Sequence, residues 1–195
     1  MLISWITQFS LIEFPKEISC IVFTPGCNMR CDFCHNPEYV LPEKIKKLKN
    51  SFILQKAFFN FLNSRIWLLT WVSICWWEPT MQKDLLEFCQ KIKNMWFKVK
   101  LDTNGTNPEL LQELLSKNLL DYVAMDLKTT IIDYEKVVWT NIDTNKILES
   151  VNIIKNSNIN YEFRTTLIKN IHTLEHIKEI SGTILKGVKN YNLQN

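Results

Sequence analysis

Three cysteines lie close together in the segment Cys27-Asn28-Met29-Arg30-Cys31-Asp32-Phe33-Cys34. The C-x3-C-x2-C spacing allows one tight turn to direct three thiolates at a single metal centre. Thiolates are soft ligands that suit iron–sulfur clusters, and three of them leave one iron of a four-iron cluster free to bind a small molecule. The competing interpretation is a zinc site with His35 or a distant cysteine as fourth ligand. Zinc knuckles more often use two separated C-x2-C pairs, so the spacing favours the cluster.

Several segments on both sides of these cysteines share a family resemblance, namely residues 9–15, 20–26, 35–38, 98–105, 122–128 and 161–166. With the cysteine loop they make the chain resemble radical S-adenosylmethionine (SAM) proteins over nearly its whole length. The segments Asp102-Thr103-Asn104-Gly105 and Met125-Asp126-Leu127-Lys128 narrow the resemblance to activases of glycyl radical enzymes. Within that group the chain is most similar to the activating proteins of anaerobic ribonucleoside-triphosphate reductase, which are relatives of the pyruvate formate-lyase activating enzyme.

This resemblance implies a specific chemistry. Cys27, Cys31 and Cys34 would hold a 4Fe-4S cluster whose open iron binds the methionine part of SAM. An electron from a reductant such as flavodoxin or ferredoxin would cleave SAM to methionine and a 5′-deoxyadenosyl radical, which removes a hydrogen atom from a glycine of the partner enzyme. The cofactors carry the chemistry in such a reaction, so we expect no general acid or base among the side chains.

The resemblance also implies roles for residues outside the cysteine loop. The backbone at Trp76 and Trp77 would accept the SAM amino group, and Glu78 would brace that turn. Phe33 would approach the adenine or shield the cluster, and His35 would lie beside the cluster without binding it. The remaining expected SAM-site residues are polar: Asp102, Asn104, Asp126, Lys128 and Arg164. Lys128 and Arg164 are the cations available for the SAM carboxylate, whereas Asp102, Thr103 and Asp126 match segments that hold a monovalent cation; ordinary turn capping is the alternative role for Asp102.

The chain departs from the family at its tryptophans. The family motif Gly-Gly-Glu-Pro reads Trp76-Trp77-Glu78-Pro79 here, and the other five tryptophans also fall where similar sequences tend to carry glycine: Trp5, Trp67, Trp71, Trp96 and Trp139. The chain has 4 glycines in 195 residues, far below the usual share of about 7%. Adding the seven tryptophans brings the total close to that share. We predict that UGA codons of this gene encode glycine and were translated as tryptophan; the alternative is a homologue with real tryptophans.

Strand-like and helix-like segments alternate along the chain, a pattern typical of repeated βα units with a parallel sheet. We expect strands at residues 19–24, 69–75, 97–101, 122–125 and 161–167, with a sixth beginning at 191. Helices are expected at 51–63, at 81–95 with Thr80 as cap, from Pro108 with Asn107 as cap, at 144–156 and from Thr173. The predicted fold is α/β, a partial (β/α)6 barrel of the radical SAM type in one domain, residues 1–195. Polar residues follow four successive strands, which places the site at the carboxyl ends of the strands.

Composition argues against two other classes, nucleic-acid-binding proteins and membrane-spanning proteins. The formal net charge is +3 with 23 basic and 20 acidic residues, so we expect no nucleic-acid partner. The longest apolar run is too short and interrupted for a membrane span, and the chain is expected to be cytoplasmic, where thiols stay reduced. Cys20, Cys75 and Cys89 lie in apolar stretches and are expected in the core.

Two further functions remain open. The first is a small radical SAM enzyme acting on a free metabolite, such as a deazapurine precursor. The second is an inactive or zinc-binding homologue, which applies if Trp76 and Trp77 are real.

Overall fold

The structure is a computed structural model that describes residues 1–14 and 17–194. Pro15, part of one of the family-like segments, therefore lies outside the described residues. The strands are β1 (Trp5–Ser10), β2 (Ser19–Phe23), β3 (Trp71–Cys75), β4 (Lys98–Thr103), β5 (Tyr122–Asp126), β6 (Asn160–Thr166) and β7 (Tyr191–Gln194). The α-helices are α1 (Pro42–Leu48), α2 (Gln55–Asn63), α3 (Leu85–Asn94), α4 (Pro108–Ser116), α5 (Tyr134–Val138), α6 (Thr144–Lys155) and α7 (Leu174–Glu179).

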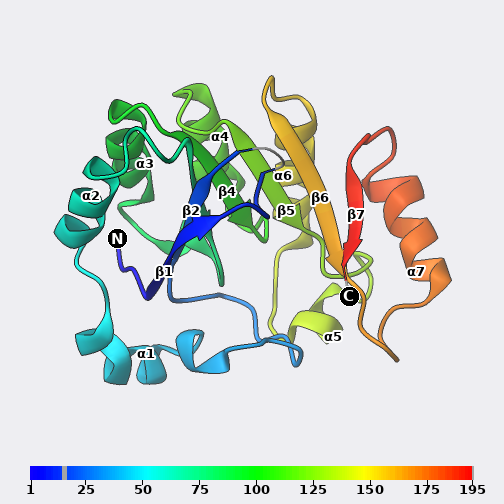
Figure 1. Ribbon diagram of the computed structural model, residues 1–195. Coiled ribbons are helices and arrows are strands. Elements are labelled where there is room, and N and C mark those ends of the chain that lie inside the picture. Colours follow the sequence, from blue (N-terminus) through cyan, green and yellow to red (C-terminus); the bar gives the residue numbers. More distant parts are fainter. Residues whose placement is uncertain (15–16, 195) are drawn as a thin grey trace.

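All seven strands form one sheet in chain order from β1 to β7. The six strands from β2 to β7 are parallel, each to the next. Figure 1 shows the carboxyl ends of these strands gathered at the bottom of the view, beside α1 and α5. The expectation of a partial barrel with six parallel strands is confirmed, and β7 is the sixth of them.

The sequence reasoning missed β1, which pairs antiparallel with β2 through partners such as Trp5 and Phe23. It also missed the short helices α1 and α5. The predicted helix at 81–95 is wrong at its beginning. Pro79–Met81 forms a separate 3-10 turn and α3 begins only at Leu85, with Asp84 rather than Thr80 at the N-cap position. Thr80 is instead bonded to the Glu78 carboxylate.

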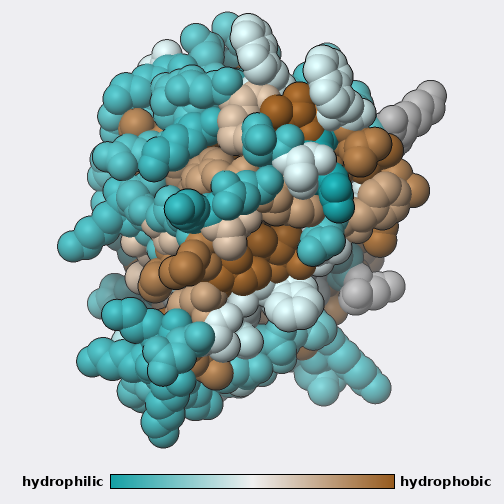
Figure 2. Space-filling model, turned by 60° about the vertical axis from the view of Figure 1, so that its left-hand side comes forward, coloured by the Kyte–Doolittle hydropathy of each residue, from teal (hydrophilic) through white to brown (hydrophobic). Residues whose placement is uncertain are grey.

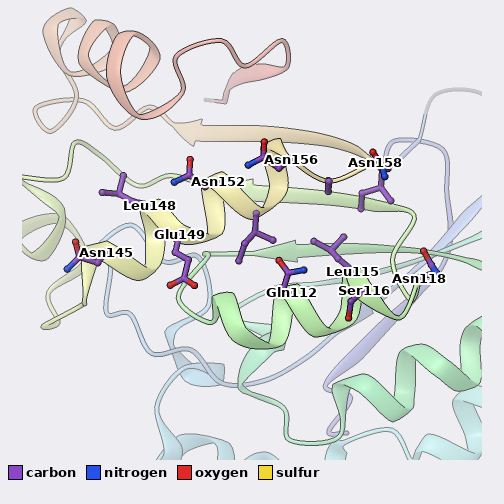
Figure 3. A pocket seen from close by; sticks show the side chains of 13 residues that line it. Gln112, Leu115, Ser116, Asn118, Asn145, Leu148, Glu149, Asn152, Asn156 and Asn158 are labelled. Atoms are coloured by element: carbon purple, nitrogen blue, oxygen red, sulfur yellow. The ribbon is translucent and has the colours of Figure 1, made fainter.

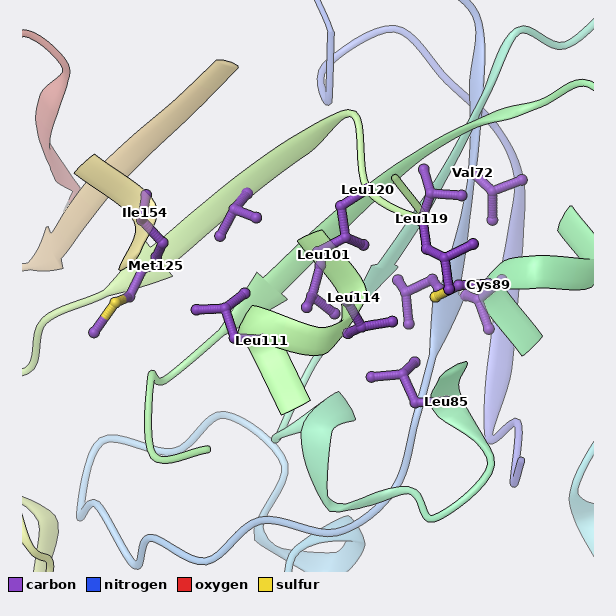
Figure 4. Close-up of a cluster of buried hydrophobic side chains, with 14 of the residues drawn as sticks. Val72, Leu85, Cys89, Leu101, Leu111, Leu114, Leu119, Leu120, Met125 and Ile154 are labelled. Atoms are coloured by element: carbon purple, nitrogen blue, oxygen red, sulfur yellow. The ribbon is translucent and has the colours of Figure 1, made fainter. Parts of the chain in front are cut away.

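Successive side chains of a strand point to opposite faces of the sheet. One face packs into the hydrophobic core, and the other faces the polar inside of the partial barrel. In β4, for example, Val99 and Leu101 are fully buried in the core cluster, whereas Lys100 and Asp102 point to the opposite face. Figure 4 shows the core between the sheet and its helices, where Leu101 and Met125 of the strands meet Leu111 and Leu114 of α4. Cys20, Cys75 and Cys89 are buried, as expected.

The surface carries hydrophobic side chains as well. Figure 2 shows a band of them running across one face, with hydrophilic surface above and below it. Among the described residues, no helix has both the length and the apolar character needed to cross a membrane.

Candidate active site

The carboxyl ends of the parallel strands surround a cavity of about 870 Å³, a size typical of small-molecule sites. Every residue that sequence reasoning placed at the site lines this cavity, with the exception of Glu78. The lining residues from that set are Cys27, Cys31, Phe33, Cys34, His35, Trp76, Trp77, Asp102, Asn104, Asp126, Lys128 and Arg164. The structure thus brings together side chains that are up to 137 positions apart in the sequence, from Cys27 to Arg164.

The cysteine loop follows β2 directly and is fixed by backbone hydrogen bonds. Gly26, which has a φ of +98°, donates its N–H to the Tyr39 carbonyl at 2.8 Å, and its own carbonyl accepts from Glu78 N–H at 2.9 Å. Arg30 N–H donates to the Val138 carbonyl at 2.8 Å, and its guanidinium donates to the Cys27 carbonyl at 2.7 Å. The loop is therefore held by α5 and by the turn after β3 before any metal binds.

The thiols sit in an environment that disfavours their ionised form. Burial raises the pKa of Cys27 to about 12, and it raises the pKa of Cys31 as well, opposed by the Lys128 ammonium. Cys27 and Cys31 are therefore neutral thiols in the metal-free loop, and a bound metal centre must displace their protons.

Glu78 lies behind the cavity, fully buried, and braces the turn that follows β3. Its carboxylate accepts hydrogen bonds from Thr80 N–H at 3.0 Å, from Thr103 Oγ1 at 2.8 Å and from Asn104 N–H at 2.6 Å. Burial raises the pKa of Glu78, and these hydrogen bonds oppose that shift. Because its partners come from two separate loops, Glu78 locks the end of β3 to the end of β4.

Asn104 links the same loop to the cysteines. Its amide donates to Asn28 Oδ1 at 2.9 Å and lies 3.9 Å from the Cys27 sulfur. Gly105 next to it has a φ of +76°, and an added Cβ would lie 2.0 Å from Met125 Cε. The positive φ favours glycine at this position, and any other residue would also displace the end of the Met125 side chain.

A chain of charges runs across the cavity floor. The Arg164 guanidinium bridges two carboxylates, with Nη2 3.0 Å from Asp102 Oδ2 and Nε 2.8 Å from Asp126 Oδ1. Lys128 Nζ lies 3.1 Å from Asp126 Oδ2. Burial acts to raise the pKa of Asp126, but the Lys128 ammonium and the Arg164 guanidinium outweigh it and hold that pKa below its usual value. Both cations expected for a SAM carboxylate are thus already paired with strand-end carboxylates.

Phe33 and His35 lie at the outer part of the cysteine loop, where Phe33 is half-buried and His35 is exposed. His172 lies in the connection between β6 and α7, outside any helix. Its Nε2 lies 2.7 Å from the Lys128 carbonyl, and its Nδ1 accepts from Ile168 N–H at 3.0 Å. This ring therefore supports the segment that carries Lys128.

Sequence reasoning missed Glu13 and Lys100 inside the barrel. Lys100 Nζ lies 2.6 Å from Glu13 Oε2 and 3.4 Å from Asp102 Oδ1. The alternation of β4 was the available signal, because it places Lys100 on the same face as Asp102. The partner, Glu13, has no such signal, since it comes from the connection between β1 and β2.

A second hollow of about 740 Å³ lies between α4 and α6 on the outside of the sheet. Figure 3 shows it lined by amides and one carboxylate, among them Gln112, Asn145, Glu149 and Asn152. None of the residues expected at the active site lines this hollow.

The donor set of the main cavity fits an iron–sulfur cluster. The three thiols come from one loop, line one cavity and lie near the Lys128 ammonium, which offsets thiolate charge. Among the described residues, no group of three or more His, Cys, Asp or Glu is arranged to hold a single metal ion. A four-iron cluster bonds each cysteine to a different iron, so its ligands need not converge on one ion.

Comparisons with known proteins agree with this chemistry. The model of the radical SAM superfamily matches residues 21–181. The chain is 36% identical to a candidate glycyl-radical enzyme activating enzyme of Methanocaldococcus jannaschii, over 94% of this chain and 75% of that protein. It is 24% identical to the pyruvate formate-lyase-activating enzyme of Clostridium pasteurianum, over 95% of this chain and 76% of that enzyme.

Among solved structures, the fold is similar to that of anSMEcpe with bound AdoMet, with a TM-score of 0.67 and 16% identity. That alignment covers 91% of this chain, which spans about half, 51%, of the other. The family implies a 4Fe-4S cluster and SAM as cofactors, in agreement with the donor set of the cavity. The chain belongs to the radical SAM superfamily, and it is an enzyme of that type.

Proposed function

We propose that this protein is a SAM-dependent activase that generates a glycyl radical on a separate enzyme, with anaerobic ribonucleoside-triphosphate reductase as the first candidate partner. The observation that carries the proposal is the shared cavity. This cavity is lined by the three thiols of the cysteine loop and by the turn after β3. It is also lined by one residue from each activase-like segment, Asn104 and Lys128. The similarity to named activating enzymes supports the same activity.

Cys27, Cys31 and Cys34 hold the cluster in this proposal. When bound and reduced, the cluster supplies the electron that cleaves SAM to methionine and a 5′-deoxyadenosyl radical. The protein would keep this chemistry away from water on the barrel side, where the paired side chains of Asp102 and Arg164 form the cavity floor. No side chain needs to act as a general acid or base, because the reaction on glycine transfers a hydrogen atom.

SAM would be held by the strand-end backbone and by the charges of the cavity floor. The carbonyls at positions 76 and 77 would accept the amino group, and Phe33, which lines the same cavity, would stack on the adenine. Lys128 and Arg164 offer the positive charge for the SAM carboxylate. Because each is already paired with Asp126, the carboxylate would join an existing network rather than meet a free cation.

A monovalent cation near SAM belongs to the same proposal. Asp102 Oδ1 is buried and receives no hydrogen bond from the described residues, whereas both oxygens of Asp126 do. Asp102 Oδ1 is therefore the atom on which a cation would bind, in competition with the Lys100 ammonium 3.4 Å away. We propose flavodoxin or ferredoxin as the reductant, with no nucleic acid or membrane involved, and the cytoplasm as the location.

The experiment that tests the activity combines two measurements on one anaerobic mixture. The reconstituted protein, carrying glycine at all seven tryptophan positions, is reduced with SAM and a glycyl radical enzyme encoded near its gene. We expect 5′-deoxyadenosine together with a glycyl doublet in electron paramagnetic resonance. The Cys31→Ala variant serves as control and should give neither signal.

Two outcomes would contradict the proposal in different ways. Deoxyadenosine without a glycyl doublet, across the plausible partners, would favour an enzyme that acts on a free metabolite. A doublet that also forms with the Cys31→Ala variant would show that the cysteine loop is not the source of the radical.

A further inference from the structure

We infer that the natural protein carries glycine at positions 76, 77, 96 and 139. In the gene, these positions and those of the other three tryptophans would be glycine codons that were translated as tryptophan. The inference rests on the backbone, the burial and the composition of this chain. It does not depend on which enzyme the protein activates.

The backbone gives the first argument. Four of the seven tryptophans lie in the left-handed region: Trp76 at a φ of +67°, Trp77 at +44°, Trp96 at +70° and Trp139 at +53°. Only a few per cent of non-glycine residues adopt such angles, which predicts about 0.3 tryptophans out of seven. The other described residues with positive φ are two asparagines and three glycines, Asn118, Asn170, Gly26, Gly105 and Gly187. Glycine and asparagine are the types that tolerate this conformation, so tryptophan is the exception.

Helix ends give an internal comparison. Trp96 follows α3 and donates its N–H to the Lys93 carbonyl at 2.9 Å, while Asn118 follows α4 and donates to the Leu115 carbonyl at 3.0 Å. Both residues have the same geometry, three positions after the carbonyl that they reach. Trp139 ends α5 in the same left-handed conformation. These are the positions at which helices favour glycine or asparagine.

The indoles at the helix ends and turns also lack the packing that tryptophan normally has. Trp96 is 93% exposed and Trp67 is 95% exposed, although tryptophan is among the more buried residue types. Trp71 differs from these two residues because its side chain is not exposed. It is buried with its ring centroid 3.7 Å from that of Phe14, and its Nε1 has no hydrogen-bond partner among the described residues. A buried N–H without a partner is unfavourable, and glycine at position 71 would remove it.

Positions 76 and 77 connect the inference to the active site. Two successive left-handed residues turn the chain from β3 toward the Glu78 brace, and the Trp76 carbonyl accepts a hydrogen bond from Thr24 Oγ1 at 3.3 Å. The centroid of the Trp76 ring lies 4.5 Å from that of Phe23, and the centroid of the Trp77 ring lies 4.8 Å from that of Tyr39. Both tryptophans line the cavity that the three cysteines of the loop also line. Without the two indoles the cavity would reach the backbone, which is where the proposed function places the SAM methionine.

The direct test is mass spectrometry of peptides from the protein purified from its source organism. We expect glycine residue masses at positions 76, 77, 96 and 139. A tryptophan residue mass at 76 or 77 would overturn the inference. This readout requires neither cluster nor SAM, so it is independent of the proposed activity.

A second test distinguishes the relief of left-handed backbone strain from the effect of removing the indole side chain. In the metal-free protein as printed, Trp96→Gly should raise the Tm more than Trp96→Ala does, because alanine keeps the left-handed strain. Trp5, in β1 and without positive φ, is the matched control, and there alanine should equal or exceed glycine. The same order of glycine and alanine at both positions would contradict the backbone argument.

A third measurement concerns the cavity and rests on the proposed function. The cluster-loaded Trp76→Gly/Trp77→Gly double variant should bind SAM, detected as a change in the cluster's electron paramagnetic resonance, whereas the chain as printed should not. Equal binding by both chains would show that the indoles do not block the site. Such a result would contradict the argument from the active site for glycine at positions 76 and 77.

Discussion

At the scale of single residues, the site depends on side chains that are neutral, paired or buried before any cofactor enters. The thiols of Cys27 and Cys31 are protonated in the metal-free chain. Asp126 is held ionised by Lys128 and Arg164. The negative charge of the bound cluster and of the SAM carboxylate would therefore meet a fixed set of positive groups instead of recruiting flexible ones.

The first prediction assigns the cluster ligands. In the seven-glycine chain, Cys27→Ala, Cys31→Ala or Cys34→Ala should each abolish the cluster, because each removes a thiolate that nothing in the loop replaces. Cys75→Ala is the strict control, since Cys75 lines the same cavity yet is expected to bind no iron. Iron and sulfide per chain after anaerobic reconstitution measure the result. A full complement in Cys31→Ala would disprove the assignment.

At the scale of elements, short connections after the strands carry the chemistry, and the helices that follow hold those connections in place. Thr103 at the end of β4 and Asn104 at the start of the loop to α4 are both hydrogen-bonded to Glu78. The start of α4 is fixed by Asn107, whose Oδ1 accepts from Leu110 N–H at 3.2 Å and whose amide donates to the Thr80 carbonyl at 3.1 Å. Asn107 therefore caps α4 and also holds the turn at Thr80, which lies beside the active site.

The second prediction tests this cap. Asn107→Ala should lower the free energy of unfolding by about 1–2 kcal/mol, the upper part of the usual range for a lost N-cap, because a second hydrogen bond is lost with it. Urea denaturation measures the change. Asn152→Ala, an exposed site within α6, is the control and should change the value by less than about 0.5 kcal/mol. Equal effects of the two substitutions would show that Asn107 does not cap α4 in solution.

At the scale of the whole molecule, an ion pair inside the barrel ties the amino-terminal segment to the sheet. Lys100 is nearly inaccessible and contacts both Glu13 and Asp102. Burial acts to lower the pKa of Lys100, but these two carboxylates outweigh it and raise that pKa. The pair thus stays charged, and it closes the barrel interior beneath the cavity.

The third prediction concerns this pair. Lys100→Met should destabilise the protein by about 3–5 kcal/mol, because it leaves the largely buried Glu13 carboxylate without its cation. The Glu13→Gln/Lys100→Met double variant should recover part of the loss. Lys117→Met is the matched control, since Lys117 forms an exposed pair with Glu113 at 2.7 Å and should cost at most about 0.5 kcal/mol. Chemical denaturation measures all three, and a loss for Lys100→Met no larger than the control would contradict the role of the pair.

The amino-acid sequence by itself determined the cysteine loop, the order of the six parallel strands and the cap at Asn107, because these are set by local spacing and by the two periodicities of strands and helices. It also placed twelve of the thirteen expected site residues at one cavity, since parallel strands end at the same edge. Only the tertiary structure decided what those residues contact. Arg164 lies between Asp102 and Asp126, and Glu13 lies against Lys100, because such pairs depend on register between strands and on the path of a loop. The resemblance already indicates glycine at the seven tryptophan positions, whereas the fold decides which of them have a left-handed backbone, namely positions 76, 77, 96 and 139.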